Sequence, residues 1–421
     1  MRDEIAIAGA GIGGLSAALS LADAGFAVRV FETVPELRPL GVGINLLPHA
    51  VRELDELGLR GELEAAGVAC GELAYYTKRG QRIWAEPRGL RAGYRWPQIS
   101  LHRGVLQMAL FHAARARIGA DRLHLGVSVD SCAAVEGGVR LRLRDRAGAL
   151  EEREARIFVA ADGIHSAARR ALYPGEGAPR WNGAVMWRGV ARAAPFLDGR
   201  TMIMSGHTAQ KFVCYPIEAP GPDGRQLLNF VAELRFEAGP LGEREDWSKR
   251  GELADFLPRF ENWRFGWLDV PALVRAADGV WVYPMVDRDP LPRWSFGPVT
   301  LLGDAAHPMY PIGSNGASQA VLDARALTGC LRFHARDPER ALARYDELRR
   351  AATSEIVLAN RRQGPEAVLQ LVEDRAPAGF AHIGDVVSDA ELASIAESYK
   401  RIAGFSVAEL NARASLATPT A

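Results

Sequence analysis

The feature that most constrains this 421-residue chain is an apolar strand pattern at residues 4–8 that runs directly into a loop with four glycines, residues 9–14. A helical pattern follows, and a second apolar strand at residues 27–31 ends in Glu32. Glu32 lies 21 positions after Gly11, which is close to the spacing of a dinucleotide-binding βαβ unit. The start of the chain therefore predicts a Rossmann-type domain that binds a dinucleotide.

Each position of this loop has a physical role in such a unit. Gly9 allows the tight turn, Gly11 lets the backbone approach a pyrophosphate, and Gly14 lets the helix and the strand pack closely. The carboxylate of Glu32 can hold the hydroxyls of an adenosine ribose, and its charge would repel a 2′-phosphate.

Two further buried strands end in acidic residues, Asp162 after residues 157–161 and Asp304 after residues 299–303. Carboxyl ends of parallel strands share one edge of a sheet, where ligands bind. After Asp304 come a loop rich in Pro and Gly and a helix over residues 317–332, so backbone N–H groups at a helix start would favour negative charge. Taken alone, this segment also fits an ordinary turn between a strand and a helix.

The character of the chain changes between residues 181 and 294, where short strand patterns alternate with turn residues. We expect a mostly antiparallel sheet there, inserted as a substrate domain into a dinucleotide-binding domain made of residues 1–180 and 295–365, with a helical segment at residues 366–421. Aromatic side chains in strands are often simply core. The candidates for a substrate pocket are Trp187, Phe212, Tyr215, Phe230 and Tyr283.

Composition excludes several classes of function. Lys and Arg together number 51, as do Asp and Glu, so no basic field predicts nucleic-acid binding. No apolar run approaches the roughly 18 residues that cross a bilayer, so no membrane partner is expected. The four cysteines, at positions 70, 132, 214 and 330, form no CxxC pair, which indicates no metal site and favours a cytoplasmic setting.

In their order and spacing, the glycine loop and the strand ends at Asp162 and Asp304 resemble those of the single-component FAD-dependent aromatic hydroxylases. This is the family of salicylate and para-hydroxybenzoate hydroxylase. A closer likeness, to the phenazine hydroxylases of pyocyanin biosynthesis, runs through residues 38–45, 84–89, 186–189 and 283–290. The resemblance covers roughly residues 4–362. It implies an α/β fold with a Rossmann-type FAD-binding domain, an inserted sheet domain that binds the substrate, and C-terminal helices.

The resemblance also implies an activity and a set of FAD contacts. NADH or NADPH would reduce the flavin, and a flavin C4a-hydroperoxide formed with O2 would hydroxylate an aromatic or heteroaromatic small molecule, with no catalytic side chain required. Epoxidation or Baeyer–Villiger oxidation by the same chemistry, and a non-catalytic FAD-binding protein, remain alternatives. The expected FAD contacts are Gly9, Gly11, Ile12, Gly13, Gly14, Glu32, Arg38, Gly43, Arg103, Val127, Asp162, Gly303, Asp304, Pro311, Gly313, Asn315, Gly316 and Ala317.

Overall fold

A six-stranded sheet forms the centre of the N-terminal half of the molecule in the computed structural model, which describes residues 4–236 and 249–418. The structure does not describe residues 1–3, 237–248 and 419–421. These residues belong to the expected N-terminal domain, the expected substrate domain and the expected C-terminal helical segment, respectively. The strand order is β20 (Ser295–Phe296), β21 (Val299–Leu301), β12 (Ile157–Ala160), β1 (Ile5–Ala8), β2 (Val28–Glu32) and β8 (Leu123–Leu125). All neighbours except β20 and β21 are parallel, so the carboxyl ends of five strands meet at one edge.

Helices with apolar faces pack beside this sheet. Helix α1 (Ile12–Asp23) contacts both α4 (Arg103–Ile118) and α8 (Gly316–Phe333), and α9 (Pro338–Arg361) packs on α8. An antiparallel sheet of β9 (Val127–Val135), β10 (Gly138–Asp145) and β11 (Leu150–Ala155) contributes to the same apolar core. The short helix α5 (Ala167–Leu172) follows the strand β12. The strands 4–8, 27–31 and 157–161 and the helix 317–332 expected from the sequence are all present, within one or two residues.

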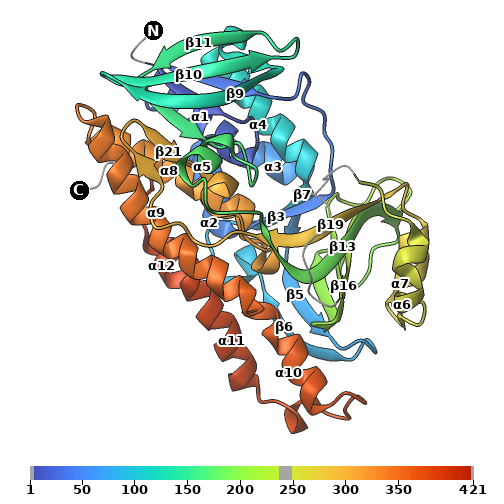
Figure 1. Ribbon diagram of the computed structural model, residues 1–421. Coiled ribbons are helices and arrows are strands. Elements are labelled where there is room, and N and C mark those ends of the chain that lie inside the picture. Colours follow the sequence, from blue (N-terminus) through green and yellow to red (C-terminus); the bar gives the residue numbers. More distant parts are fainter. Residues whose placement is uncertain (1–3, 237–248, 419–421) are drawn as a thin grey trace.

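A seven-stranded, mostly antiparallel sheet forms the second half (Figure 1). Its order is β19 (Val280–Asp287), β13 (Arg180–Ala193), β16 (Gln226–Arg235), β15 (Gln210–Pro216), β14 (Thr201–His207), β5 (Glu72–Tyr76) and β6 (Arg82–Pro87). Only the β14–β5 pair is parallel. The expected limits 181–294 are therefore too narrow for this sheet, because β5 and β6 come from residues 72–87 and pair with its β14 edge.

A small sheet joins the two halves. It consists of β3 (Gly43–Leu46), β7 (Gln98–His102) and β4 (Val68–Cys70), with β7 in the middle. The helices α2 (Pro48–Glu56) and α3 (Arg60–Ala66) lie between β3 and β4 in the chain, and α2 also packs on α8. The chain thus passes from the first half to the second near residue 70, near residue 180 and again near residue 365.

Helices cover both faces of the seven-stranded sheet. On one face α6 (Leu257–Phe260) and α7 (Val270–Arg275) bury an aromatic cluster, with the short pair β17 (Arg264–Phe265) and β18 (Leu268–Asp269) beside it. On the other face α10 (Ala367–Arg375) packs its apolar residues against β14 and β5. The helices α11 (Asp389–Ile402) and α12 (Val407–Ala412) complete the band that runs down one side in orange and red in Figure 1. Helix α10 therefore belongs to the wall of the second half, whereas residues 413–417 return to α2 and α8 of the first half.

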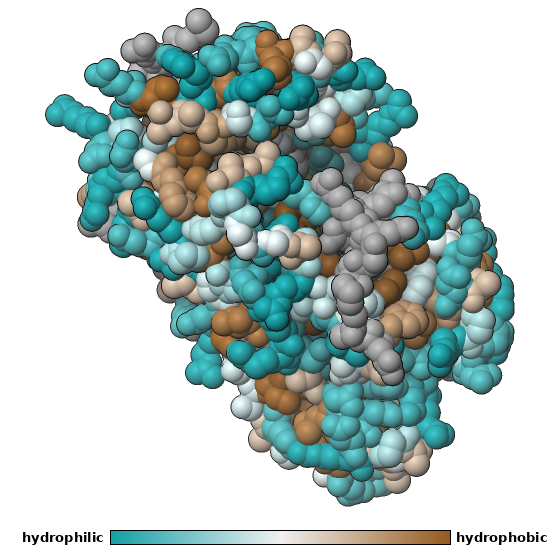
Figure 2. Space-filling view, in the orientation of Figure 1, coloured by the Kyte–Doolittle hydropathy of each residue, from teal (hydrophilic) through white to brown (hydrophobic). Residues whose placement is uncertain are grey.

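The surface seen in Figure 2 is largely hydrophilic, and its apolar residues form small separate groups. Among the described residues, no helix is both long enough and apolar enough to cross a membrane.

Candidate active site

The glycine loop after β1 is shaped by close backbone contacts. Gly9 has φ +97°, and a Cβ there would lie 2.4 Å from the carbonyl oxygen of Ala161. A Cβ on Gly14 would lie 2.0 Å from the carbonyl oxygen of Gly9. Both positions therefore require glycine for the fold itself. Gly11 differs, because a Cβ there meets no heavy atom within 4 Å, so its missing side chain leaves open space beside the loop.

The start of α1 offers N–H groups to an anion. Gly11 is the N-cap, no side chain caps the helix, and no acidic residue lies in its first turn. The unpaired N–H groups, which belong to Ile12 and Gly13 among others, and the helix dipole together favour a phosphate at this position. This arrangement fits the pyrophosphate of a dinucleotide.

Glu32 holds the same loop from the neighbouring strand. Its Oε2 accepts a hydrogen bond from the N–H of Ala10 at 2.7 Å, and its Oε1 accepts one from Val34 at 2.9 Å. Gln107 on α4 donates from Nε2 to the carbonyl oxygen of Ala10 at 2.8 Å. Nothing in the sequence singled out Gln107, because a glutamine within an amphipathic helix carries no motif.

Arg103 and Asp304 lie in the crevice at the edge of the parallel sheet. Both side chains are solvent-accessible, yet burial among protein atoms lowers the pKa of Arg103 and raises the pKa of Asp304. In each case the opposite charge of the other residue partly offsets the effect of burial. Because protein atoms replace part of the water around both groups, their charges would act strongly on a ligand bound beside them.

Asp162 ends β12 at the same edge. Its Oδ2 accepts from the N–H of Ala167 at 2.8 Å, at the start of α5, and its buried Oδ1 has no hydrogen-bond partner among the described residues. Burial raises the pKa of Asp162, and its hydrogen bonds to Ser166 and Ala167 partly offset this. A half-exposed carboxylate with an unused oxygen fits a hydroxyl donor of a ligand.

A buried network supports the Gly303–Asp304 turn from behind. Asp323 on α8 accepts from the N–H of Gly303 at 3.1 Å and contacts Nε2 of His307 at 2.5 Å. Arg349 on α9 donates to the second oxygen of Asp323 at 2.8 Å. His307 is thus held by a carboxylate within the protein, which gives it a structural role.

The loop between Pro311 and Ala317 is fixed by the C-terminal helix α11. Gly313 has φ +69°, and its carbonyl oxygen accepts from Asn315 Nδ2 at 3.2 Å. Asn315 also donates to the hydroxyl of Tyr399 at 2.9 Å, and that hydroxyl donates to Asn360 at 2.7 Å. Pro311 is exposed, whereas Gly316 and Ala317 are half-buried at the start of α8, where no side chain caps the helix and no acid lies in the first turn.

Of three further expected cofactor residues, two bind other protein groups. Arg38 lies on an exposed loop and pairs with Glu36 at 2.7 Å. The N–H of Gly43 donates to Asn229 at 2.7 Å and its carbonyl oxygen accepts from Arg188 at 2.8 Å, both on the second sheet. A Cβ on Gly43 would lie 2.6 Å from that of Asn229, so close packing between sheets explains this glycine. Val127 lies half-buried at the start of β9, opposite Asp145.

The five aromatic residues expected to line one pocket lie on both faces of the second sheet. Trp187, Phe212 and Phe230 belong to the cluster under α6 and α7, where Trp187 stacks on Phe256 at 5.2 Å. Tyr215 and Tyr283 lie on the opposite face. The expectation of one shared pocket is therefore wrong, because successive side chains of a strand point to opposite faces.

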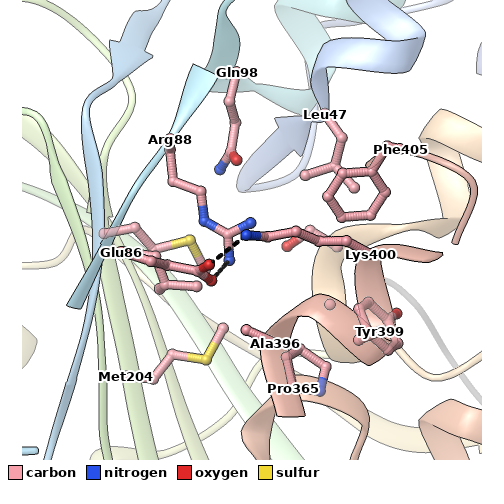
Figure 3. A pocket seen from close by; sticks show the side chains of 14 residues that line it. Leu47, Glu86, Arg88, Gln98, Met204, Pro365, Ala396, Tyr399, Lys400 and Phe405 are labelled. Atoms are coloured by element: carbon pink, nitrogen blue, oxygen red, sulfur yellow. Dashed lines mark hydrogen bonds and ion pairs between the residues drawn. The ribbon is translucent and has the colours of Figure 1, made fainter. Parts of the chain in front are cut away.

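A cavity lies where the second sheet, the Gly313 loop and α11 meet (Figure 3). Its apolar lining comes from Leu47, Met202, Met204 and Phe405, and Gly313 and Ser314 form the side toward the first half. Glu86, Arg88, Gln98 and Lys400 contribute its polar groups. The sequence could have predicted that Met202 and Met204 lie on the same face of β14, because residues two apart in a strand point to the same side.

Comparison with known proteins matches this architecture. A family model described as "FAD binding domain" covers residues 2–215 and 278–360. The chain is 44% identical over 406 residues to "Phenazine 1,6-dicarboxylic acid hydroxylase PhzS" of Lysobacter antibioticus, covering 95% of this chain and 97% of that protein. It is 34% identical over 379 residues to a 3-amino-4-hydroxybenzoate 2-monooxygenase of Streptomyces cremeus, covering 86% and 87% of the two chains.

Solved structures give the same picture of the fold. A salicylate hydroxylase substrate complex aligns with a TM-score of 0.74 at 22% identity, over 100% of this chain and 99% of the other. HpxO of Klebsiella pneumoniae, complexed with FAD and uric acid, aligns with a TM-score of 0.71 at 25% identity, over 95% and 92% of the two chains.

Proposed function

Because the chain belongs to the family of FAD-dependent aromatic hydroxylases, we propose that it hydroxylates a planar, phenazine-like heteroaromatic molecule with O2 and either NADH or NADPH. One observation carries the proposal for the site. Gly313 and Ser314 belong to the loop after the Asp304 turn, and they also line the cavity below the second sheet. A flavin ring held by this loop would therefore face a substrate held by the second sheet.

The cofactor would lie along the crevice from the start of α1 to the start of α8. We assign the pyrophosphate to the N–H groups of residues 11–14 and the adenosine ribose to Glu32. Arg103, Asp162 and Asp304 would hold the phosphates and the ribityl chain. Arg38 and Gly43 bind other protein groups, so we propose that they shape the opening of the cofactor site. Val127 keeps the predicted backbone contact with adenine.

Bound FAD supplies the chemistry, since it accepts a hydride from NADH or NADPH and activates O2. The residues of the chain orient the reactants and exclude water. The N–H groups of Asn315 and Gly316 at the start of α8 would hold negative charge on the cofactor. The apolar side chains of Leu47, Met202 and Met204 would keep the reaction space dry, which favours oxygen transfer over release of peroxide.

The remaining predictions concern the setting of the enzyme. None of the four cysteines, all of which lie in the described residues, forms a disulfide, which supports a reducing, cytoplasmic compartment. We also keep the expected division into a discontinuous FAD-binding domain and a substrate domain, with β5 and β6 added to the latter.

Replacing Asp304 with alanine tests the crevice assignment. We expect FAD affinity to fall roughly tenfold or more, because a desolvated carboxylate that accepts from a ligand hydroxyl contributes about 1.5–3 kcal/mol. Equilibrium titration of the apoprotein with FAD gives the dissociation constant. Asp278→Ala, at an exposed position beside the second sheet, is the control. Equal FAD affinity in the two variants would remove Asp304 from the cofactor site.

The proposed activity is tested with the purified holoenzyme. NADH and NADPH oxidation should be measured with phenazine, quinoline, salicylate and phenol ligands. We expect a flavin absorption spectrum and faster oxidation with a phenazine-type ligand than with no ligand. A flavoprotein whose reduction no aromatic ligand accelerates would contradict the proposed function.

A further inference from the structure

Three buried charged residues, which we call the ion triad, connect the second sheet to the turn before α10. Lys211 on β15 lies directly opposite Glu233 on β16, and Glu366 ends the turn η6 (Gly364–Glu366). The ammonium of Lys211 lies 2.9 Å from the carboxylate of Glu233 and also donates to Glu366. Each of the three residues is at most 6% exposed. Burying charges in this way is costly, and none of the three lines the cavity described above.

The triad also reaches the loop that we propose to hold the flavin. The carboxylate of Glu366 accepts a hydrogen bond from the backbone N–H of Gly313. The turn η6 packs directly on η5 (Ile312–Ser314), which contains this glycine. Burial raises the pKa of Glu366, and the charge of Lys211 opposes that effect. Glu366 therefore binds the second sheet through Lys211 and the flavin loop through Gly313.

The backbone on both sides of this contact has an unfavourable conformation. Ser314 has φ +57° and Gln363 has φ +71°, and they are two of the three non-glycine residues with positive φ in the part of the chain that the structure describes. The side chain of Tyr399 fills the space between the two turns. A Cβ on Gly313 would lie 2.2 Å from its hydroxyl, and a Cβ on Gly364 would lie 2.9 Å from its ring. Such conformations persist only where their surroundings fix them.

We propose that Glu366 is a positioning residue for the flavin, because its bonds to Lys211 and Gly313 keep the loop at residues 312–315 in the conformation that receives the ring. The inference rests on the proposed placement of the flavin and adds a function for a segment outside the family likeness. Glu366 lies beyond residues 4–362, which carry the resemblance, and beyond the match to the family model.

The charge of the triad adds a second, measurable consequence. Two carboxylates and one ammonium leave excess negative charge behind the loop. This charge opposes the negative charge that a flavin gains on reduction, so the triad should hold the reduction potential of the bound flavin low.

Two substitutions in the triad separate contact from charge. Glu366→Gln and Glu233→Gln each remove one negative charge from the triad, but only Glu366 bonds to the loop. We expect Glu366→Gln to weaken FAD binding about tenfold, because a charged hydrogen-bond acceptor is lost. Glu233→Gln should bind FAD within about twofold of the wild type. Both variants should show a more positive reduction potential. Titration of the apoprotein with FAD gives the affinity, and spectroelectrochemistry of the holoenzyme gives the potential.

Two further variants complete the design. Glu366→Asp keeps the charge but shortens the side chain, so it should weaken FAD binding while its potential changes less than that of Glu366→Gln. It also decides the question of contact if Glu366→Gln does not fold, which thermal unfolding of each apoprotein shows. Glu373→Gln is the matched control, because it removes a carboxylate on α10 that pairs with Lys78 and not with the loop. It should change neither quantity.

The outcomes separate this inference from the proposed function. Wild-type FAD affinity in both folded Glu366 variants, or an equal loss of affinity in Glu233→Gln, would overturn the positioning role. An unchanged potential in both glutamine variants would overturn the role of the charge. Either result leaves the proposed hydroxylation intact. That proposal fails separately, if no aromatic ligand accelerates reduction of the flavin in the wild type.

Discussion

Replacing Gly11 with valine is expected to leave the apoprotein folded and to lower its affinity for FAD by about 100-fold or more. The backbone at Gly11, with φ −76° and ψ −178°, is extended and suits valine. A Cβ there touches no protein atom within 4 Å. The added methyl groups would instead occupy the space at the start of α1 where we assign the pyrophosphate.

Two other glycines control this experiment. Gly61→Val, in α3, also meets no atom within 4 Å and should keep normal FAD affinity. Gly14→Val should impair folding itself, because its Cβ would lie 2.0 Å from a backbone oxygen. Thermal unfolding of each apoprotein and titration with FAD distinguish these cases. Normal FAD binding by a folded Gly11→Val protein would contradict the assignment of the pyrophosphate.

Replacing Asp323 with alanine is expected to lower the free energy of unfolding by about 3–5 kcal/mol. Asp323 is fully buried and holds Gly303, His307 and Arg349 at once. Its removal would leave the guanidinium of Arg349 buried without its carboxylate partner, and would release the turn that positions Asp304. Denaturant unfolding of the apoprotein measures the first effect, and FAD titration measures the second.

The same carboxylate predicts a dependence of stability on pH. Burial alone would raise the pKa of Asp323, but the charges and hydrogen bonds of His307 and Arg349 outweigh it, so the pKa is lowered. A carboxyl with a lower pKa in the folded state stabilises the fold above its ordinary pKa, and this contribution is lost as the pH falls. Asp323→Ala should therefore lose less stability than the wild type on acidification.

Asp337→Ala is the control for the loss of stability in Asp323→Ala. It removes the exposed N-cap of α9 and should lower the free energy of unfolding by only about 1 kcal/mol. An equal loss in the two variants would contradict the role of Asp323.

The sequence predicted the first half of the molecule well because its signals are local. The strand before Gly9, the acid at Glu32 and the turn at Asp304 each follow from residues that are adjacent in the chain. Parallel strands then bring the ends of β1, β12 and β21 to one edge without further information. The family and its flavin chemistry follow from these motifs.

The substrate side was harder to predict, because its groups come from distant segments. Leu47 and Phe405 both line the cavity, yet they are more than 300 positions apart in the chain. Phe212 and Tyr215 could have been separated from the sequence, since residues three apart in a strand face opposite sides. The packing of α6, α7 and α10 decides which side of the sheet faces the cofactor. The alternation of residues along a strand does not predict that packing.

Product analysis with isotope-labelled dioxygen tests the central claim most directly. The holoenzyme should be supplied with NADH or NADPH and phenazine-1-carboxylate, and the product examined by mass spectrometry. We predict a product that carries one labelled oxygen atom on the ring, formed in proportion to the NAD(P)H consumed. The opposite result would be that every aromatic ligand tried is recovered unchanged and the consumed reducing equivalents appear as hydrogen peroxide. That result would contradict the assignment of this site to aromatic hydroxylation.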